Sequence, residues 1–203
     1  MRRRQRQHVN PFGLHSLTPR GPLSLPAHGP VEIDLGCGDG AFSIARGEAH
    51  PETFVQGLDI RKRFITPGVE EIARRGLTNV RFETCNLIVD GSRLFPEGRI
   101  RRFFINFPDP LFKHRQRHRR WLTDVVVAAL VQALEPGGEI LFQSDVWTPS
   151  IDALGLFELA TELENIDGEF TFAKERIVEE WTTREQVCLV DVRRIWRLRF
   201  RRA

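Results

Sequence analysis

Three glycines follow a short apolar run near the start of the chain, in the segment VEIDLGCGDG at residues 31–40. Gly36, Gly38 and Gly40 would let the backbone turn sharply and let a ligand approach without obstruction by a Cβ atom. A helix that starts here would point its free N–H groups at the same ligand. The spacing is G-x-G-x-G, which departs from the G-x-G-x-x-G of dinucleotide sites. Asp34 precedes the loop and could accept a hydrogen bond from a ligand amine.

Two more polar residues follow the next two apolar runs. Asp59 ends FVQGLD, and Asn86 follows NVRFETC. A carboxylate at the second strand tip suits the two hydroxyls of a ribose, and an amide offers the donor and acceptor that an adenine edge requires. Taken singly, the glycine loop could be only a tight turn and Asp59 only a helix N-cap. Taken with Asp34, they indicate a nucleoside that carries an amino acid, which is S-adenosylmethionine.

Alternating strands and helices would position these residues. The expected strands cover residues 31–36, 53–60, 79–86, 99–107 and 139–145, and the expected helices cover 41–50, 63–76, 118–138 and 149–165. Such alternation is typical of an α/β fold in which helices cover both faces of a mostly parallel sheet. Ligands bind at the carboxyl edge of such a sheet, so the polar residues would meet there.

The two ends of the chain depart from this alternation. Residues 170–178 and 185–200 alternate apolar and polar types as strands do, and could form an antiparallel hairpin at the sheet edge. Residues 1–29 are rich in Arg, Pro, Gly and His and are expected to form an irregular basic arm. Residues 30–203 are then one Rossmann-like domain of the class I S-adenosylmethionine-dependent methyltransferase type.

One stretch, FFINFPDPLFKHRQRHRRWL at residues 103–122, changes character abruptly. Its start reads as a strand that ends near the expected cofactor. Pro108 and Pro110 then bracket Asp109 and stiffen the backbone around its carboxylate. Guanine presents N1–H and N2–H donors on one edge, which match a carboxylate. The alternative is an acid in an ordinary proline turn, but its place at the strand tip favours a functional role.

A basic run follows directly. Positive charge at the start of a helix opposes the helix macrodipole, which suggests that a polyanion compensates it. The residues expected to contact RNA phosphates are Lys113, His114, Arg115, Arg117, His118, Arg119 and Arg120. A solvated basic face is the alternative, and binding to phosphates would depend strongly on salt.

The segment NFPDPLFKHRQRHRRWLT at residues 106–123 resembles the NFPDPWxKxRHxKRR segment of the bacterial tRNA (guanine-N7)-methyltransferases of the TrmB family. The resemblance covers roughly residues 31–200. It implies transfer of a methyl group from S-adenosylmethionine to N7 of a guanosine in the tRNA variable loop, at tRNA position 46.

By position, the resemblance also implies roles for single residues. Asp34, Asp59 and Asn86 match cofactor-binding positions, with Asn86 standing where an acid is usual. Asp109 matches the acid at which cofactor and guanine meet, and it is the candidate catalytic residue. The implied substrate-binding residues are Lys113, Asp145, Thr182, Thr183, Arg184 and Glu185.

Two departures from the family pattern bear on the substrate. Leu111 stands where a Trp is usual, and Arg184 stands where an aromatic residue is usual. They leave two alternatives open. The chain could methylate another RNA, a protein or a small molecule, or it could bind tRNA or the cofactor without catalysis.

The expected reaction needs no general base, because N7 of guanine carries an in-plane lone pair and no proton. The protein has to hold donor and acceptor in line, within about 3–3.5 Å. Methylation leaves positive charge on the guanine, so a fixed carboxylate would also stabilise the transition state. Asp109 would do both, with Asp145 and Glu185 in support.

The bulk composition agrees with this reading. The formal net charge is +3 and the pI about 9.1, and the basic residues cluster as they do in RNA-binding proteins. The three cysteines lack metal-site spacing, so we expect a reduced cytoplasmic protein without a metal. No apolar run approaches about 18 residues and the basic N-terminus lacks a long apolar segment, so neither a transmembrane helix nor a secretory signal is expected. We expect a monomer or a homodimer, with tRNA as its partner.

Overall fold

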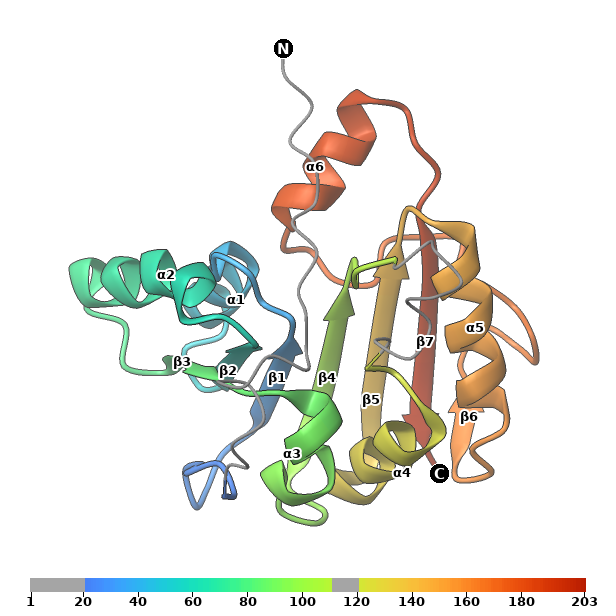
Figure 1. Ribbon diagram of the computed structural model, residues 1–203, viewed down its shortest axis with the longest axis horizontal. Coiled ribbons are helices and arrows are strands. Elements are labelled where there is room, and N and C mark those ends of the chain that lie inside the picture. The colour runs from blue at the N-terminus through green and yellow to red at the C-terminus, as the bar shows by residue number, and fades with distance from the viewer. Residues whose placement is uncertain (1–20, 111–120) are drawn as a thin grey trace.

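A mixed β-sheet forms the centre of the computed structural model, which describes residues 21–110 and 121–203. Within these residues the strand order is β3-β2-β1-β4-β5-β7-β6, as Figure 1 shows. The strands are β1 (Val31–Leu35), β2 (Phe54–Asp59), β3 (Val80–Thr84), β4 (Ile100–Asn106), β5 (Leu134–Ser144), β6 (Leu163–Asn165) and β7 (Trp196–Arg202). The pairs from β3 to β5 are parallel, and β7 runs antiparallel to both β5 and β6. The predicted α/β fold is therefore confirmed.

Helices cover both faces of the sheet (Figure 1). One face packs on α3 (Leu87–Leu94), α4 (Asp124–Ala133) and α5 (Trp147–Glu158), and the other on α1 (Ala41–Ala49) and α2 (Lys62–Arg75). A sixth helix, α6 (Thr183–Val190), lies beyond the arrowheads of β4 and β5. It therefore stands above the carboxyl edge, where the site is expected.

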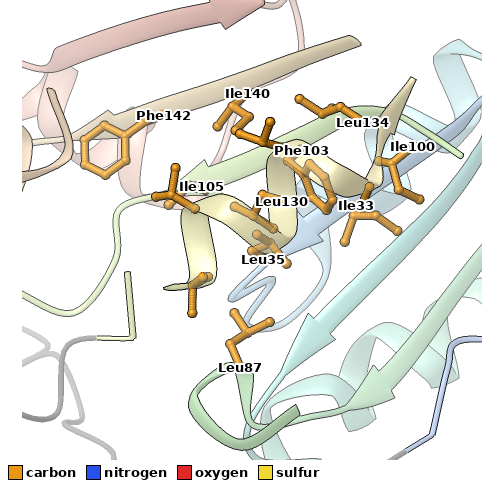
Figure 2. Packing of buried hydrophobic residues seen from close by; sticks show 14 of the residues in the cluster. Ile33, Leu35, Leu87, Ile100, Phe103, Ile105, Leu130, Leu134, Ile140 and Phe142 are labelled. Atoms are coloured by element: carbon orange, nitrogen blue, oxygen red, sulfur yellow. The ribbon is translucent and has the colours of Figure 1, made fainter. Parts of the chain in front are cut away.

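The central strands are rich in apolar residues because both of their faces are largely buried. In β4, Phe103 and Ile105 lie in the same cluster as Leu130 of α4, as Figure 2 shows. Phe104 points the other way and packs edge-on against Phe42 of α1, with ring centroids 4.9 Å apart. This rigid double-sided core fixes where β4 ends.

A row of alternating charges crosses the middle of the sheet. Glu32 of β1 stands opposite Arg102 of β4, Arg102 opposite Glu139 of β5, and Glu139 opposite Arg201 of β7. Arg102 lies 2.9 Å from each of its two neighbours, and Glu139 lies 3.4 Å from Arg201. Arg46 of α1 forms an ion pair with the buried Glu32 carboxylate at 2.8 Å. We call this set the charge row.

The five predicted strands between residues 31 and 145 are confirmed, but the bounds of two helices are wrong. The helix expected over 118–138 starts at Asp124 in the described residues, where the Thr123 side chain caps it, and it gives way to β5 at Leu134. The helix expected over 149–165 ends at Glu158. The last three residues of the predicted range, Leu163–Asn165, form β6 instead. Helix α3 was not predicted; its signal was Asn86, whose side chain accepts the Ile88 N–H as an N-cap.

The predicted antiparallel hairpin at the C-terminal edge of the sheet is confirmed, but the residues predicted for its strands are wrong. The antiparallel edge pairs β7 with β6, while residues 170–178 contribute only a bridge between Ala173 and Arg197. Residues 185–190 are helical, as part of α6. The missed signal is a capping box, T-x-x-E, in which the Thr182 hydroxyl accepts the Glu185 N–H at 3.0 Å. Local capping outweighs the alternating pattern here.

Part of the expected arm is described, from residue 21. Leu23 is buried in the main core cluster, and its N–H donates to the Leu94 carbonyl at 2.9 Å. Arg81 and Arg99 donate to the carbonyls of Ser24 and Pro26. The boundary between arm and domain at residues 29 and 30 stays a prediction.

Candidate active site

The glycine loop turns between β1 and α1 as the sequence predicts. Gly36, Gly38 and Gly40 all have positive φ, at 81°, 58° and 79°, a region that strongly favours glycine. A Cβ at Gly36 or Gly38 would meet open space, whereas one at Gly40 would come within 2.3 Å of the Phe82 ring. The first two glycines therefore face a ligand space, and the third permits close packing.

A cavity of about 380 Å³ opens beside this loop, and we call it the first cavity. Its polar side chains come from the tips of successive strands and include Asp59, Asn86 and Asp109. Its apolar walls include Ile60, Phe64, Leu87 and Ile88. Apolar walls with a few fixed polar groups suit a nucleoside base and sugar.

Asp59 is held rigidly at the second strand tip. Its two carboxylate oxygens accept the N–H groups of Gly38 and Arg61, each at 3.1 Å. Burial raises the pKa of Asp59, and the backbone hydrogen bonds oppose that rise. Because the backbone fixes the carboxylate where it lines the cavity, Asp59 can accept hydrogen bonds from ribose hydroxyls.

Asp34 lies deeper than the sequence suggests. It is 1% exposed, and its carboxylate accepts the Ser43 hydroxyl at 2.7 Å and the Asn106 amide at 3.4 Å. Burial is the main cause that raises the pKa of Asp34 to about 6, and the charges of Asp59 and Asp39 add to it. It does not line the first cavity.

Ser43 and Asn106 are site residues that the sequence reasoning missed. Asn106 also accepts the Gln143 amide at 2.9 Å, so it links the tips of β1, β4 and β5. Its position as the first residue of NFPDP was the available signal. Nothing in the sequence marked Ser43.

A second cavity, of about 280 Å³, adjoins the first. Gly36, Asn106, Phe107 and Asp109 line both. The remaining walls of the second cavity are Asp34, Cys37, Asp39, Phe42, Thr182, Thr183 and Arg184. Asp109 thus stands where the two spaces meet. The turn that brings it there passes through Phe107, whose φ of 50° is uncommon for a residue with a side chain.

The predicted substrate residues of the TTRE segment divide into two groups. Thr182, Thr183 and Arg184 line the second cavity, and Arg184 donates to the buried Asp145 carboxylate at 2.5 Å. Glu185 is 2% exposed and is not among the residues that line that cavity. It accepts Arg197 at 2.8 Å and Arg176 at 3.4 Å. The geometry therefore indicates that Glu185 attaches α6 to the rest of the fold through Arg176 and Arg197.

Five predicted RNA-contacting residues, Lys113, Arg115, Arg117, Arg119 and Arg120, lie outside the described residues, as does Leu111. Across 21–110 and 121–203, no cluster of three or more His, Cys, Asp or Glu side chains could hold a metal ion. In the same ranges, no helix has both the length and the apolar character to cross a bilayer.

Comparison with known proteins bears on what this site does. Residues 28–198 match the model of a family described as "Putative methyltransferase". A tRNA (guanine-N(7)-)-methyltransferase of Parasynechococcus marenigrum is 32% identical, over 97% of this chain and 87% of that protein. The enzyme of the same name from Anaeromyxobacter dehalogenans is also 32% identical, over 87% and 88%.

Solved structures give the same fold at lower identity. The aminoglycoside resistance methyltransferase NpmB1 matches with a TM-score of 0.57 and 19% identity, over 86% of this chain and 87% of that one. A SAM-dependent methyltransferase from Aquifex aeolicus matches with a TM-score of 0.57 and 12% identity, over 86% and 83%. These structures show the fold, and the two sequence relatives at 32% identity over most of both chains show the family: the chain belongs to the tRNA (guanine-N(7)-)-methyltransferase family.

Proposed function

We propose that this protein transfers a methyl group from S-adenosylmethionine to N7 of a guanosine in tRNA. The observation that carries the proposal is the position of Asp109, which borders both the first and the second cavity. A bisubstrate transfer needs donor and acceptor held side by side in a reactive geometry, which two adjoining cavities allow. The names of the relatives, which are tRNA (guanine-N(7)-)-methyltransferases, support this substrate.

The first cavity would hold the cofactor. Asp59 would accept the ribose hydroxyls, Asn86 would meet the adenine edge, and Ile60 and Phe64 would flank the base. Gly36 and Gly38 would allow the amino-acid part to approach the backbone, towards Asp34. When bound, S-adenosylmethionine supplies an electrophilic methyl group.

The second cavity would hold the guanine. Asp109 would accept donors from the guanine edge and turn N7 towards the first cavity. No residue has to remove a proton, because N7 carries a lone pair. The carboxylates of Asp34, Asp39 and Asp109 line this space and would stabilise the positive charge that develops on the base.

We further propose the wider setting. The target is a guanosine of the tRNA variable loop, and Lys113, Arg115, Arg117, Arg119 and Arg120 would hold the tRNA phosphates. The protein would act in the cytoplasm, as a monomer or a homodimer.

Methyl transfer to defined transcripts tests the proposal. Labelled S-adenosylmethionine and an unmodified tRNA transcript should yield one N7-methylated guanosine, located by strand cleavage at that base. A transcript with 7-deazaguanosine at the target should accept no label, because the attacking atom is missing. Asp109→Asn should lower kcat at least about 100-fold, since a fixed charge near the reacting atoms is lost. Label on another base of the tRNA would overturn the proposal.

One observation favours a second candidate, a methyltransferase for another acceptor. Arg184 stands where the family pattern has an aromatic residue, and it pairs with Asp145. At this position the wall of the second cavity is therefore charged and offers no aromatic ring on which a base could stack. Competition decides between the two: if excess tRNA leaves methylation of the true acceptor unaffected, the second candidate holds.

A further inference from the structure

Three aromatic rings gather on the surface near the carboxyl end of β5. The ring centroids of Trp147 and Trp196 are 4.5 Å apart, and Phe172 lies 5.7 Å from the first and 5.1 Å from the second. The Arg194 guanidinium lies over the Trp196 ring at 3.7 Å. We call Trp147, Phe172, Arg194 and Trp196 the aromatic platform.

The platform is built from three separate parts of the chain at one place in the fold. Trp196 begins β7 and stands opposite Ser144, the last residue of β5. Trp147 begins α5 three residues later, and Phe172 precedes the bridge from Ala173 to β7. All three rings therefore lie on the same edge of the sheet as both cavities.

A single residue connects the platform to the second cavity. Asp145 lies between Ser144 and Trp147 in the chain, and it binds Arg184, which lines that cavity, at 2.5 Å. Arg193, the neighbour of Arg194, approaches the same carboxylate at 3.7 Å. A nucleotide next to a base in the second cavity would thus find the platform close by.

The platform has features that core packing does not require. Trp147 is 50% exposed, although a buried indole contributes more to stability than an exposed one. Among the residues that the structure describes, no carboxylate pairs with Arg194, so its guanidinium keeps its charge available on the ring. Aromatic rings and ring-stacked guanidinium planes are the groups on which proteins stack unpaired RNA bases.

We propose that the platform stacks an unpaired nucleotide that adjoins the methylated guanosine and so sets the register of the RNA at the active site. The base would stack on Trp147 or on the outer face of the Arg194 guanidinium, and Arg194 would add charge attraction to the phosphate. This inference rests on the proposed function, since it takes RNA as the substrate.

A binding cycle with an abasic RNA tests the platform. Trp147→Ala should weaken tRNA binding about 5- to 100-fold, the loss usual for one base–aromatic stack. An abasic site at one nucleotide beside the target guanosine should weaken binding to the wild-type protein by a similar factor. The same abasic RNA should then bind Trp147→Ala with little further loss, because one interaction has been removed from both sides.

Control variants separate stacking from folding. Leu159→Ala removes an 81% exposed apolar side chain at the other end of α5 and should leave tRNA binding unchanged. Trp147→Phe keeps an aromatic face and should retain most of the affinity, whereas Trp147→Leu should not. The affinity for S-adenosylmethionine should stay the same in all four variants.

Three outcomes would overturn the inference. The first is a Trp147→Ala protein that melts earlier but binds tRNA as tightly as the wild type, since the rings would then be packing only. The second is additive losses in the cycle, and the third is a dimer that Trp147→Ala dissociates. If wild-type protein methylates no tRNA at all, the proposed function fails instead, and this result is distinct from the other three.

Discussion

Asp34 shows how a single site residue can weaken the fold that carries it. Its carboxylate is buried, and it titrates with a pKa of about 6 instead of the ordinary 3.8. The folded state therefore binds the proton more tightly than the unfolded chain does. The stability contributed by protonated Asp34 is complete below about pH 4 and is lost as the pH rises through 6, to an extent on the order of 3 kcal/mol.

Asp34→Asn removes this titration. We expect the variant to gain unfolding free energy over the wild type at pH 7.5, and to lose that advantage as the pH falls towards 4. Urea unfolding of both proteins across this range measures the difference. A difference that stays constant with pH would contradict the assignment of the titration to Asp34.

Asp59 offers a contrasting test, because its carboxylate contacts the backbone on one side and the first cavity on the other. Asp59→Asn can still accept the Gly38 N–H but pairs poorly with two hydroxyls. We expect its Kd for S-adenosylmethionine to rise about 10- to 100-fold, which corresponds to roughly 1.4–3 kcal/mol. Thermal unfolding with and without cofactor reports this loss, and an unchanged cofactor-induced shift would remove Asp59 from the site.

At the scale of elements, α6 depends on individual side chains for its attachment. Glu185 pairs with Arg176 and Arg197, and Arg184 pairs with Asp145. Within α6, Cys188 is the one apolar residue that is buried. The helix that carries part of the second cavity is thus held largely by charge, and its position should respond to changes in those charges.

Glu185→Gln tests this attachment. The variant leaves Arg197, whose side chain is 11% exposed, without its carboxylate, which costs about 3 kcal/mol when the site is fully buried. We expect faster hydrogen exchange across residues 183–190 and a higher KM for tRNA, while exchange in β1 and β4 stays slow. Gln186→Ala, an exposed neighbour on the same helix, serves as the control and should change neither.

Element by element, the sequence predicts the parallel half of the sheet well and the last third poorly. Strands such as Phe54–Asp59 are short, mostly apolar and almost wholly buried, and this burial decides their structure. In contrast, residues 185–190 are predicted as the start of a strand, yet the Thr182 cap makes them helical. The meeting of Asp59 and Asp109 at one cavity could be predicted because strand tips converge in this fold, while their roles there stay predictions. The ion pair of Arg184 with Asp145 could not, since it depends on how α6 folds back.

At the scale of the whole molecule, the charge row joins parts of the chain that no local contact connects. Glu32→Gln would leave Arg46 and Arg102 facing a neutral amide in a largely buried place, so we expect a loss of about 3 kcal/mol in global unfolding free energy. Glu71→Gln removes a carboxylate from the more exposed ion pairs with Arg74 and Arg75. It should cost less than about 1 kcal/mol, and equal losses in urea unfolding would contradict the role of the charge row.

The charge row also disfavours wrong registers between neighbouring strands. A parallel strand that slides by two residues keeps its apolar side chains on the same face, so core packing alone penalises such an error weakly. If β4 slid by two residues, Glu32 would face Ile100 or Phe104 instead of Arg102, and this buried carboxylate would keep Arg46 but lose one of its two partners. Glu32 and Arg102 are 70 positions apart in the chain, so no turn can set their alignment. The Glu32–Arg102 pair therefore fixes the register between β1 and β4. This register also brings Asp109, which follows β4, level with the glycine loop that follows β1.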